Sequence, residues 1–272
     1  MVNNYIPPDY SKSISKLKEI LPGILKDTHS LAEISQKPES DFIVILESSY
    51  RRAHHMLQAI SRLSEHPHLS SPVYVLTRSL IEDVVAIEYI IEFGKEAMSN
   101  QFRDFYWIQS KEDNEFIREF GLDNDPDIKT TVDEVEKRFK AVKKTFQRAD
   151  GSLNRNWAGI DVDRMLSKLM KAKPKLLPLD QIKAVSRGYL YANRKTHFNP
   201  IDLKRYMNEQ SLRADYDQTM VEALSLAISS MVRLTTRYID EISELAGKNM
   251  HIKIGEKLKT HFAKMESALK ET

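Results

Sequence analysis

The sequence predicts an all-α protein, a single multi-helix bundle with a central buried helix at about 72–93. Three observations predict this fold class. Only 8 of the 272 residues are glycine, and a glycine-poor chain rich in Glu, Lys and Leu favours helices. Apolar residues recur with three-four spacing from end to end, which is the period of an amphipathic helix. No segment shows the alternation of apolar and polar residues that is typical of a strand.

Two helices are expected before the central one. The first covers about 14–31, and Pro22 should kink or split it, because proline has no N–H to donate and its ring crowds the preceding turn. The second covers about 41–64 and ends before the turn at Pro67.

The central helix has the clearest ends. Ser71 is expected to cap its first turn, and Gly94 suits its last one. Apolar residues cover nearly the whole circumference between these two positions. A helix that is apolar on almost every side is normally buried by neighbours on every side. We therefore expect this helix in the middle of the bundle.

More amphipathic helices follow, separated by polar or proline-containing breaks. The segments expected to be helical are 96–120, 128–146, 161–171, 180–197, 216–247 and a final one around 258–269. We expect a helical bundle domain over 1–250. The remainder, 251–272, is then a C-terminal amphipathic helix that packs loosely or binds a partner, so the C-terminal helices could form a homodimer or hold a partner protein.

The composition excludes several classes of protein. The chain has no cysteine, which removes disulfides, thiolate metal sites and cysteine nucleophiles and fits a reducing compartment. No apolar run approaches the roughly 18 residues of a membrane span, and from the residues at the amino terminus we expect no signal peptide. We therefore expect a cytoplasmic protein without membrane contact.

The dinucleotide, Walker, zinc-protease and nucleophile-elbow motifs are absent, so we expect neither a metal nor a cofactor.

Positive charge is concentrated in one segment. Between Arg164 and Lys195 the chain has nine basic residues and one acidic residue, so this segment carries 9 − 1 = +8 and the rest carries 2 − 8 = −6. A block of one sign attracts polyanions, or it forms a solvated face that docks on the acidic remainder. For the first case the candidate ligand-binding residues are Arg187, Arg194 and Lys195, and the partner is RNA.

Four polar residues form the candidate catalytic site. Arg78 and Glu82 are four apart on the central helix, so they share one face with apolar neighbours. Asn193 and His197 are four apart near the end of the helix at 180–197, on its inward stripe. A carboxylate such as Glu82 could hold one ring nitrogen of His197 and set its tautomer. The alternative is a structural network that only fixes packing.

Three aromatic residues complete the set of candidate ligand-binding residues. Tyr189 belongs to the stripe of Asn193 and His197, and Tyr89 shares a face with the Arg78 pair. Trp157 stands in a short loop between asparagines and an arginine, where it could stack on a base. The alternative for Trp157 is a lid over the core.

Several of these motifs resemble one uncharacterised bacterial family. Arg78-Ser-Leu-Ile-Glu82 with the residues up to Tyr89, then Phe102-Arg-Asp-Phe-Tyr106, Trp157-Ala-Gly-Ile-Asp-Val and the stretch from Tyr189 to Pro200 are similar to the domain of unknown function 5677. The likeness covers about 72–200. It implies an Arg-x-x-x-Glu helix that faces a Tyr…His helix, and it implies no established reaction.

A more distant likeness is to the HEPN superfamily of helical bundles, which are often RNA-cleaving toxins or antiviral defence proteins. Their motif is an arginine, a polar residue, three further residues and a histidine. Asn193-Arg-Lys-Thr-His197 is similar to the second part, whereas Ala192 stands where the arginine would be. This departure argues against metal-independent RNA cleavage by the usual motif, unless Arg78 replaces that arginine in space.

Three functions follow from these observations. The first is an RNA-directed HEPN-like module, a metal-independent ribonuclease of stress or phage defence, in which His197 is the general acid or base. The second is a sensor that holds a small polar ligand between the same helices. The third is a scaffold without catalysis, in which the polar network only fixes packing.

Overall fold

The computed structural model describes residues 9–32, 40–121, 126–172, 209–246 and 248–270. This part of the chain contains eight α-helices that pack into a bundle, and it contains no strand, only one isolated bridge between Gln147 and Leu153. The fold is therefore all-α, as the sequence predicts. The helices are α1 (Ser11–Ala32), α2 (Asp41–Leu63), α3 (Ser70–Phe93), α4 (Lys95–Glu119), α5 (Pro126–Phe146), α6 (Val162–Ala172), α9 (Glu209–Ala246) and α10 (Lys248–Leu269).

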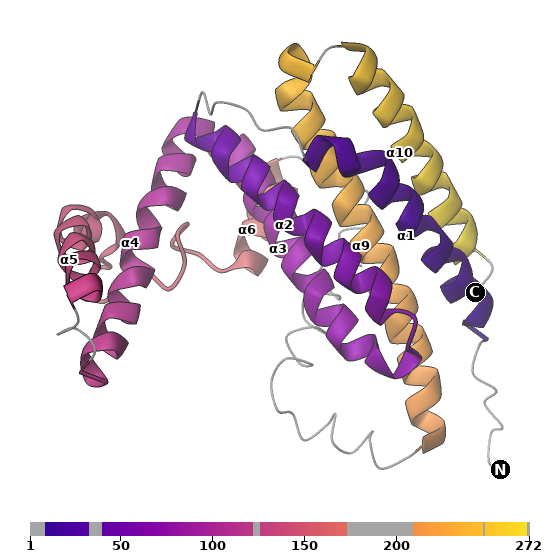
Figure 1. The fold of residues 1–272 in the computed structure, drawn as a ribbon, viewed down its shortest axis with the longest axis horizontal. Coiled ribbons are helices and arrows are strands. Elements are labelled where there is room, and N and C mark those ends of the chain that lie inside the picture. The colour runs from indigo at the N-terminus through magenta and orange to yellow at the C-terminus, as the bar shows by residue number, and fades with distance from the viewer. Residues whose placement is uncertain (1–8, 33–39, 122–125, 173–208, 247, 271–272) are drawn as a thin grey trace.

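The longest helix, α9, lies at the centre of the bundle and contacts most of the other helices. It packs against α3 over its greatest length and also against α1, α2 and α10 (Figure 1). Helix α3 in turn contacts α2, α4, α6 and α9. The expected central helix is thus correctly identified, with α9 as its main partner.

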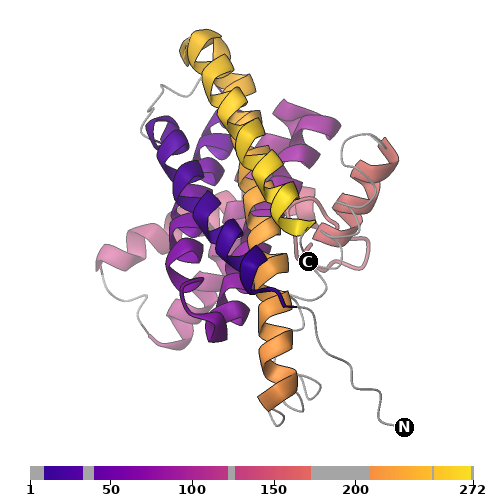
Figure 2. The same cartoon turned by 90° about the vertical axis from the view of Figure 1, so that its right-hand side faces the viewer.

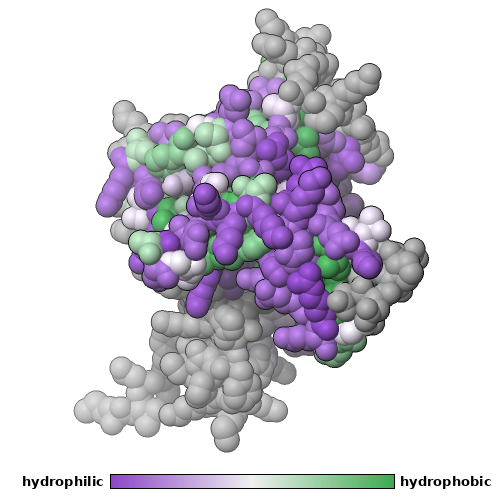
Figure 3. Space-filling model, turned by 90° about the vertical axis from the view of Figure 1, so that its left-hand side faces the viewer, coloured by the Kyte–Doolittle hydropathy of each residue, from purple (hydrophilic) through white to green (hydrophobic). Residues whose placement is uncertain are grey.

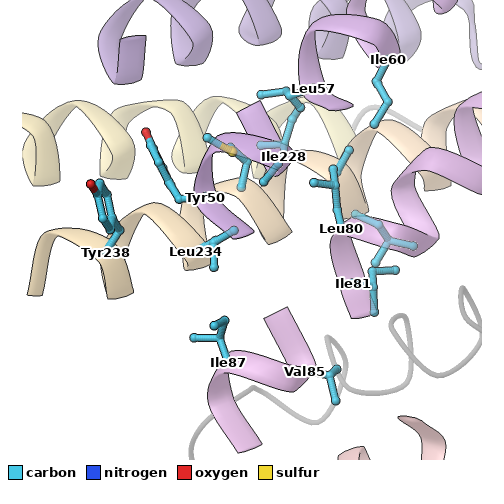
Figure 4. Packing of buried hydrophobic residues seen from close by; sticks show 14 of the residues in the cluster. Tyr50, Leu57, Ile60, Leu80, Ile81, Val85, Ile87, Ile228, Leu234 and Tyr238 are labelled. Atoms are coloured by element: carbon cyan, nitrogen blue, oxygen red, sulfur yellow. The ribbon is translucent and has the colours of Figure 1, made fainter. Parts of the chain in front are cut away.

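Large apolar and aromatic side chains fill the space between α2, α3 and α9. Figure 4 shows Leu57 and Ile60 of α2 near Leu80 of α3 and Ile228 of α9. The rings of Tyr50 and Tyr238 stack with centroids 4.5 Å apart. The Tyr50 hydroxyl donates a hydrogen bond to the Thr28 carbonyl of α1 at 3.1 Å, so a buried polar group of the core is satisfied, as its burial requires.

Helix α10 forms an outer layer with α1. Figure 2 shows both helices in front of α9, and the apolar face of α10 is buried against them. Gly23 permits this close approach, because a Cβ at that position would lie 2.7 Å from the His261 ring. His261 Nε2 and Lys257 Nζ both bind the Asp27 carboxylate, at 2.9 and 2.5 Å. The helix expected to serve a partner thus has its apolar face covered within the chain.

Helices α4 and α5 form a hairpin that extends from the side of the bundle (Figure 1). Val132, Val135 and Phe139 of α5 are buried, and Asn114 of α4 donates a hydrogen bond to the Val132 carbonyl at 3.2 Å. The sequence predicts both helices but not their projection, because each has an amphipathic pattern that would also fit a compact bundle.

Three details of the helices differ from expectation. Helix α1 continues through Pro22, which is exposed, so of the expected kink or split the split is wrong. The loss of one N–H is tolerated because the apolar residues on both sides stay packed. Helix α3 begins at Ser70, and Leu69 rather than Ser71 occupies the cap position, after a short 3₁₀ turn at Pro67–Leu69. Helix α9 starts seven residues before the expected position 216.

Among the helices of the described ranges, none is both long and apolar enough to cross a membrane.

Candidate functional site

The predicted pair on α3 forms in the structure. Arg78 Nε donates a hydrogen bond to Glu82 Oε1 at 2.8 Å, and the two side chains are 22% and 31% exposed. They stand on the arc of α3 that its neighbours cover only partly, together with Ser79 and Asp83. The central helix therefore has one polar, half-buried strip, which its nearly continuous apolar pattern does not reveal.

Asp83 adds a second charged pair to this strip. Its carboxylate Oδ2 lies 3.2 Å from Arg52 Nε of α2, and only 14% of its side chain is exposed. Burial raises the pKa of Asp83 to about 6, the Arg52 charge opposes this shift, and the neighbouring Glu82 charge adds to it. A carboxyl group that changes its protonation state near neutral pH is a typical feature of functional sites, although structural pairs also show it.

Glu88 forms a third cluster on a different face of α3. Arg233 Nε and Arg237 Nε of α9 donate hydrogen bonds to Glu88 Oε1 at 2.5 and 2.7 Å, and Arg237 Nη2 donates one to Oε2 at 2.9 Å. Burial alone would raise the pKa of Glu88, but the hydrogen bonds and charges of Arg237 and Arg233 outweigh it, so the pKa lies below its ordinary value. This cluster joins the two main helices.

The predicted aromatic residues Tyr89 and Trp157 lie together. Their ring centroids are 5.9 Å apart, and Phe102 of α4 approaches Trp157 from another side at 5.2 Å. Gln101 Nε2 donates a hydrogen bond to the Trp157 carbonyl at 2.7 Å, and the indole is buried. The loop that carries Trp157 thus closes over the junction of α3 and α4, and stacking of this ring on a base stays a prediction.

The described part of the basic segment is α6. Its apolar face, with Met165, Leu166 and Leu169, is buried, and the helix packs against α3. Arg164, Lys168 and Lys171 are exposed, and within the described ranges none of the three makes an ion pair. These cations are four and three residues apart, so they lie along one face of the helix.

The other predicted residues fall outside the described ranges. They are Arg187, Tyr189, Asn193, Arg194, Lys195 and His197. The pairing of Asn193 and His197 with Arg78 and Glu82 therefore stays a prediction. In the part of the chain that is described, no group of three histidine, aspartate or glutamate side chains is arranged to hold a metal ion.

Sequence reasoning missed Arg52, Asp83 and the Glu88 cluster. A signal for the Glu88 cluster exists, because Glu88 interrupts the apolar stripe of α3, and Arg233 and Arg237 are one turn apart on α9. A buried charge needs a partner of opposite sign. No comparable signal exists for Asp83, whose burial depends on how α2 packs beside it.

Comparison with known proteins gives one match. A family model described as a family of unknown function (DUF5677) matches residues 43–214, more than half of the 272 residues. No curated protein matches the chain, and no solved structure does. The matched range includes α3 and α6 with their polar residues, whereas α1 and α10 lie outside it. The HEPN likeness gains no support from these comparisons and stays a hypothesis.

Proposed function

Because this chain belongs to the DUF5677 family, whose function is unknown, we propose a function from its own residues: an RNA-directed helical module of HEPN type. It binds RNA phosphates through the basic segment that begins on α6. It acts on the RNA beside the Arg78–Glu82 pair of α3.

The exposed cations of α6 carry this proposal. Basic residues that dock on the acidic remainder of the chain would form ion pairs with it. Arg164, Lys168 and Lys171 instead face solvent without ion pairs to the described residues, although six units of net negative charge lie elsewhere in the chain. Uncompensated cations on one face are what phosphate binding requires, since each one can replace a counterion of the nucleic acid.

The pair on α3 supplies the chemistry of the proposed site. The Arg78 guanidinium stabilises negative charge on a phosphate, and Glu82 fixes the orientation of Arg78 through the 2.8 Å hydrogen bond. Since α6 packs on α3, a single-stranded RNA bound along α6 runs close to the helix that carries the Arg78–Glu82 pair.

The cleavage step is assigned to His197, with Asn193 to orient it. The imidazole takes the proton of a ribose 2′-hydroxyl, and the oxygen attacks the adjacent phosphorus. The bond to the 5′-oxygen breaks, this oxygen takes a proton from water, and the hydroxide that remains takes the proton held by the imidazolium. The products are a 2′,3′-cyclic phosphate and a 5′-hydroxyl end.

Binding is tested with a fluorescent unpaired RNA and a variant that combines Arg164→Gln, Lys168→Gln and Lys171→Gln. The slope of log K against log salt concentration is negative, and we expect it to become shallower by about two units in this variant. Each lost phosphate contact on a single strand accounts for about 0.7 of this change. The charge-matched control combines Lys253→Gln, Lys259→Gln and Lys264→Gln on α10. It should bind like the wild type, because these exposed lysines lie among the glutamates of α10, which packs against α1 and α9, whereas α6 packs against α3.

Cleavage is tested with His197→Ala, which should abolish cutting of the same RNA and leave its binding and the helical content unchanged. A wild-type chain that neither binds nor cuts RNA at low salt would overturn the proposal. Binding without any cutting would retain the RNA-directed module and remove the ribonuclease. A rise in melting temperature with a small polar compound, in the absence of RNA binding, would instead identify a ligand sensor.

A further inference from the structure

A second basic surface lies on α5, well separated along the chain from the basic segment. From Lys137 to Arg148 the sequence has six basic residues and no acidic one. Lys137, Lys140 and Lys144 are exposed and are spaced three and four residues apart, so they form one stripe. The buried residues Val135 and Phe139 face α4, and the stripe lies on the opposite side of the helix.

The lysine stripe is not neutralised by the acidic residues of its own hairpin. Glu134 pairs with Arg138 at 2.7 Å, and Glu136 pairs with Lys111 and Arg118 of α4 at 2.8 and 3.0 Å. None of the three stripe lysines makes an ion pair with a described residue. Glu134 and Glu136 are thus held by other cations, although the Lys137 charge also acts on Glu134. Asp133, one turn before Lys137, is exposed and makes no ion pair with a described residue. The stripe therefore has one carboxylate at its start and none from Lys137 to Lys144, and it keeps a net positive charge.

Two ordinary explanations account for only part of this pattern. Cations in the last turn of a helix are favoured by the helix dipole, which applies to Lys143 and Lys144. The effect fades within one turn, so it does not extend to Lys137 and Lys140. A merely soluble surface mixes charges of both signs, as α10 does with Glu256 and Glu266 among its lysines.

The chemistry of the stripe fits the outside of a double helix better than unpaired bases. Proteins that bind single strands use exposed aromatic rings on which bases stack. The aromatic residues of α5, Phe139 and Phe146, are buried, and its outward face carries lysines and Ala141. The exposed aromatic residues of the hairpin, Tyr106, Phe116 and Phe120, belong to α4 and its end and not to the stripe. Figure 3, which views the molecule from the side on which α4 and α5 lie in Figure 1, shows a mostly hydrophilic surface with smaller apolar patches.

The dimensions also agree with a duplex. The eight residues from Lys137 to Lys144 span about 10 Å of helix. A double-stranded nucleic acid carries one negative charge per roughly 1.7 Å of its axis, so this length meets several phosphates. Because α5 stands on a projecting hairpin (Figure 1), a rigid duplex can reach the stripe without meeting the bundle.

We propose that the lysine stripe of α5 binds the phosphate backbone of a double-helical part of the RNA substrate. This inference rests on the proposed function and deepens it: the substrate is a folded RNA in which a duplex, held by α5, adjoins the unpaired segment that α6 and α3 receive.

The experiment compares two fluorescent RNAs of equal length, a hairpin with an unpaired tail and an unpaired strand. The stripe variant combines Lys137→Gln, Lys140→Gln and Lys144→Gln. Its control is the charge-matched α10 variant with Lys253→Gln, Lys259→Gln and Lys264→Gln. We expect the wild type to prefer the hairpin. The stripe variant should lose about tenfold or more of its hairpin affinity. Its negative slope of log K against log salt concentration should be shallower by about two to three units. Its affinity for the unpaired strand should stay within twofold of the wild type.

The outcomes separate this inference from the function on which it rests. If the wild type binds the hairpin and the stripe variant binds it equally well, the α5 surface is refuted while RNA binding stands. An equal loss in the α10 control would show a general charge effect and would refute it too. A DNA duplex that binds more tightly than the RNA hairpin would overturn the assignment to RNA. A wild type that binds neither RNA removes the proposed function itself.

Discussion

Two glutamates of α3 form ion pairs of opposite character. Glu88 is 4% exposed and receives three hydrogen bonds from two arginines of another helix. Glu82 has a side chain that is 31% exposed, and it receives one hydrogen bond from Arg78 of its own helix. The first pair joins two parts of the fold, while the second joins two neighbouring positions that are already fixed by the helix. Residue type alone therefore does not separate a structural ion pair from a candidate site.

Asp83 is intermediate between these two. Its side chain is 14% exposed, between those of Glu88 and Glu82, and its partner Arg52 has a side chain that is 58% exposed and offers one contact. Burial consequently dominates at Asp83 and raises its pKa, whereas the two arginines dominate at Glu88 and lower its pKa. The number and the burial of the partner arginines therefore decide whether the pKa of the carboxyl group is raised or lowered.

The largest expected effect is at Glu88. Glu88→Gln removes the main counter-charge of two half-buried arginines and leaves Arg237 only the longer contact to Asp240, at 3.9 Å. Breaking a buried ion pair from one side costs about 3–5 kcal/mol of unfolding free energy. The measurement is urea denaturation at neutral pH. The control combines Glu88→Leu, Arg233→Met and Arg237→Leu, which removes all the charges together and should recover most of the loss. A stable Glu88→Gln protein would show that the cluster does not hold α3 to α9.

The sequence predicts features that depend on residues close together in the chain, and it does not predict contacts between residues far apart in the chain. Helices at 96–120 and 128–146 are predicted within a few residues because capping and periodicity act between near neighbours. The Arg78–Glu82 pair is predicted for the same reason, since residues four apart on a helix always share a face. The pair Glu88–Arg237 joins residues 149 positions apart, and no local pattern fixes that contact.

The polar strip of α3 shows a second limit. Val75 and Ala86 help to make the helix look apolar all round, yet they are only half-buried, because the neighbouring helices leave this arc partly uncovered. Which arc stays open depends on how helices pack, and the burial of Asp83 depends on the same packing. The α4–α5 hairpin is a similar case, since an amphipathic pattern says that one face is buried but not against which partner.

The next effect is pH-dependent and belongs to Asp83. Because its folded pKa of about 6 lies above the ordinary value of 3.8, the folded state holds the proton more tightly. The stabilisation of the folded state by this bound proton is complete below the ordinary pKa, and it is lost as the pH rises through about 6. Asp83→Asn should remove this dependence, so its unfolding free energy relative to the wild type should rise by on the order of 2 kcal/mol between pH 4 and pH 7.

Denaturation curves at several pH values measure this difference. Asp113→Asn changes an exposed carboxylate of α4 and controls for the change in net charge. A difference between Asp83→Asn and the wild type that is constant with pH would mean that Asp83 is not protonated in this window.

The smallest effect on stability is expected at Glu82, and it sharpens the comparison most. Glu82→Gln breaks a half-exposed pair within one helix, which contributes below about 1 kcal/mol. Glu47→Gln is the matched control, because Glu47 and Arg51 form the same kind of four-residue pair on α2 at 2.5 Å. Both variants should have nearly wild-type melting temperatures. Only Glu82→Gln should weaken RNA binding or cleavage, since Arg78 loses the group that orients it. If Glu82→Gln unfolds the protein as Glu88→Gln does, then both glutamates are structural, and the candidate site on α3 is wrong.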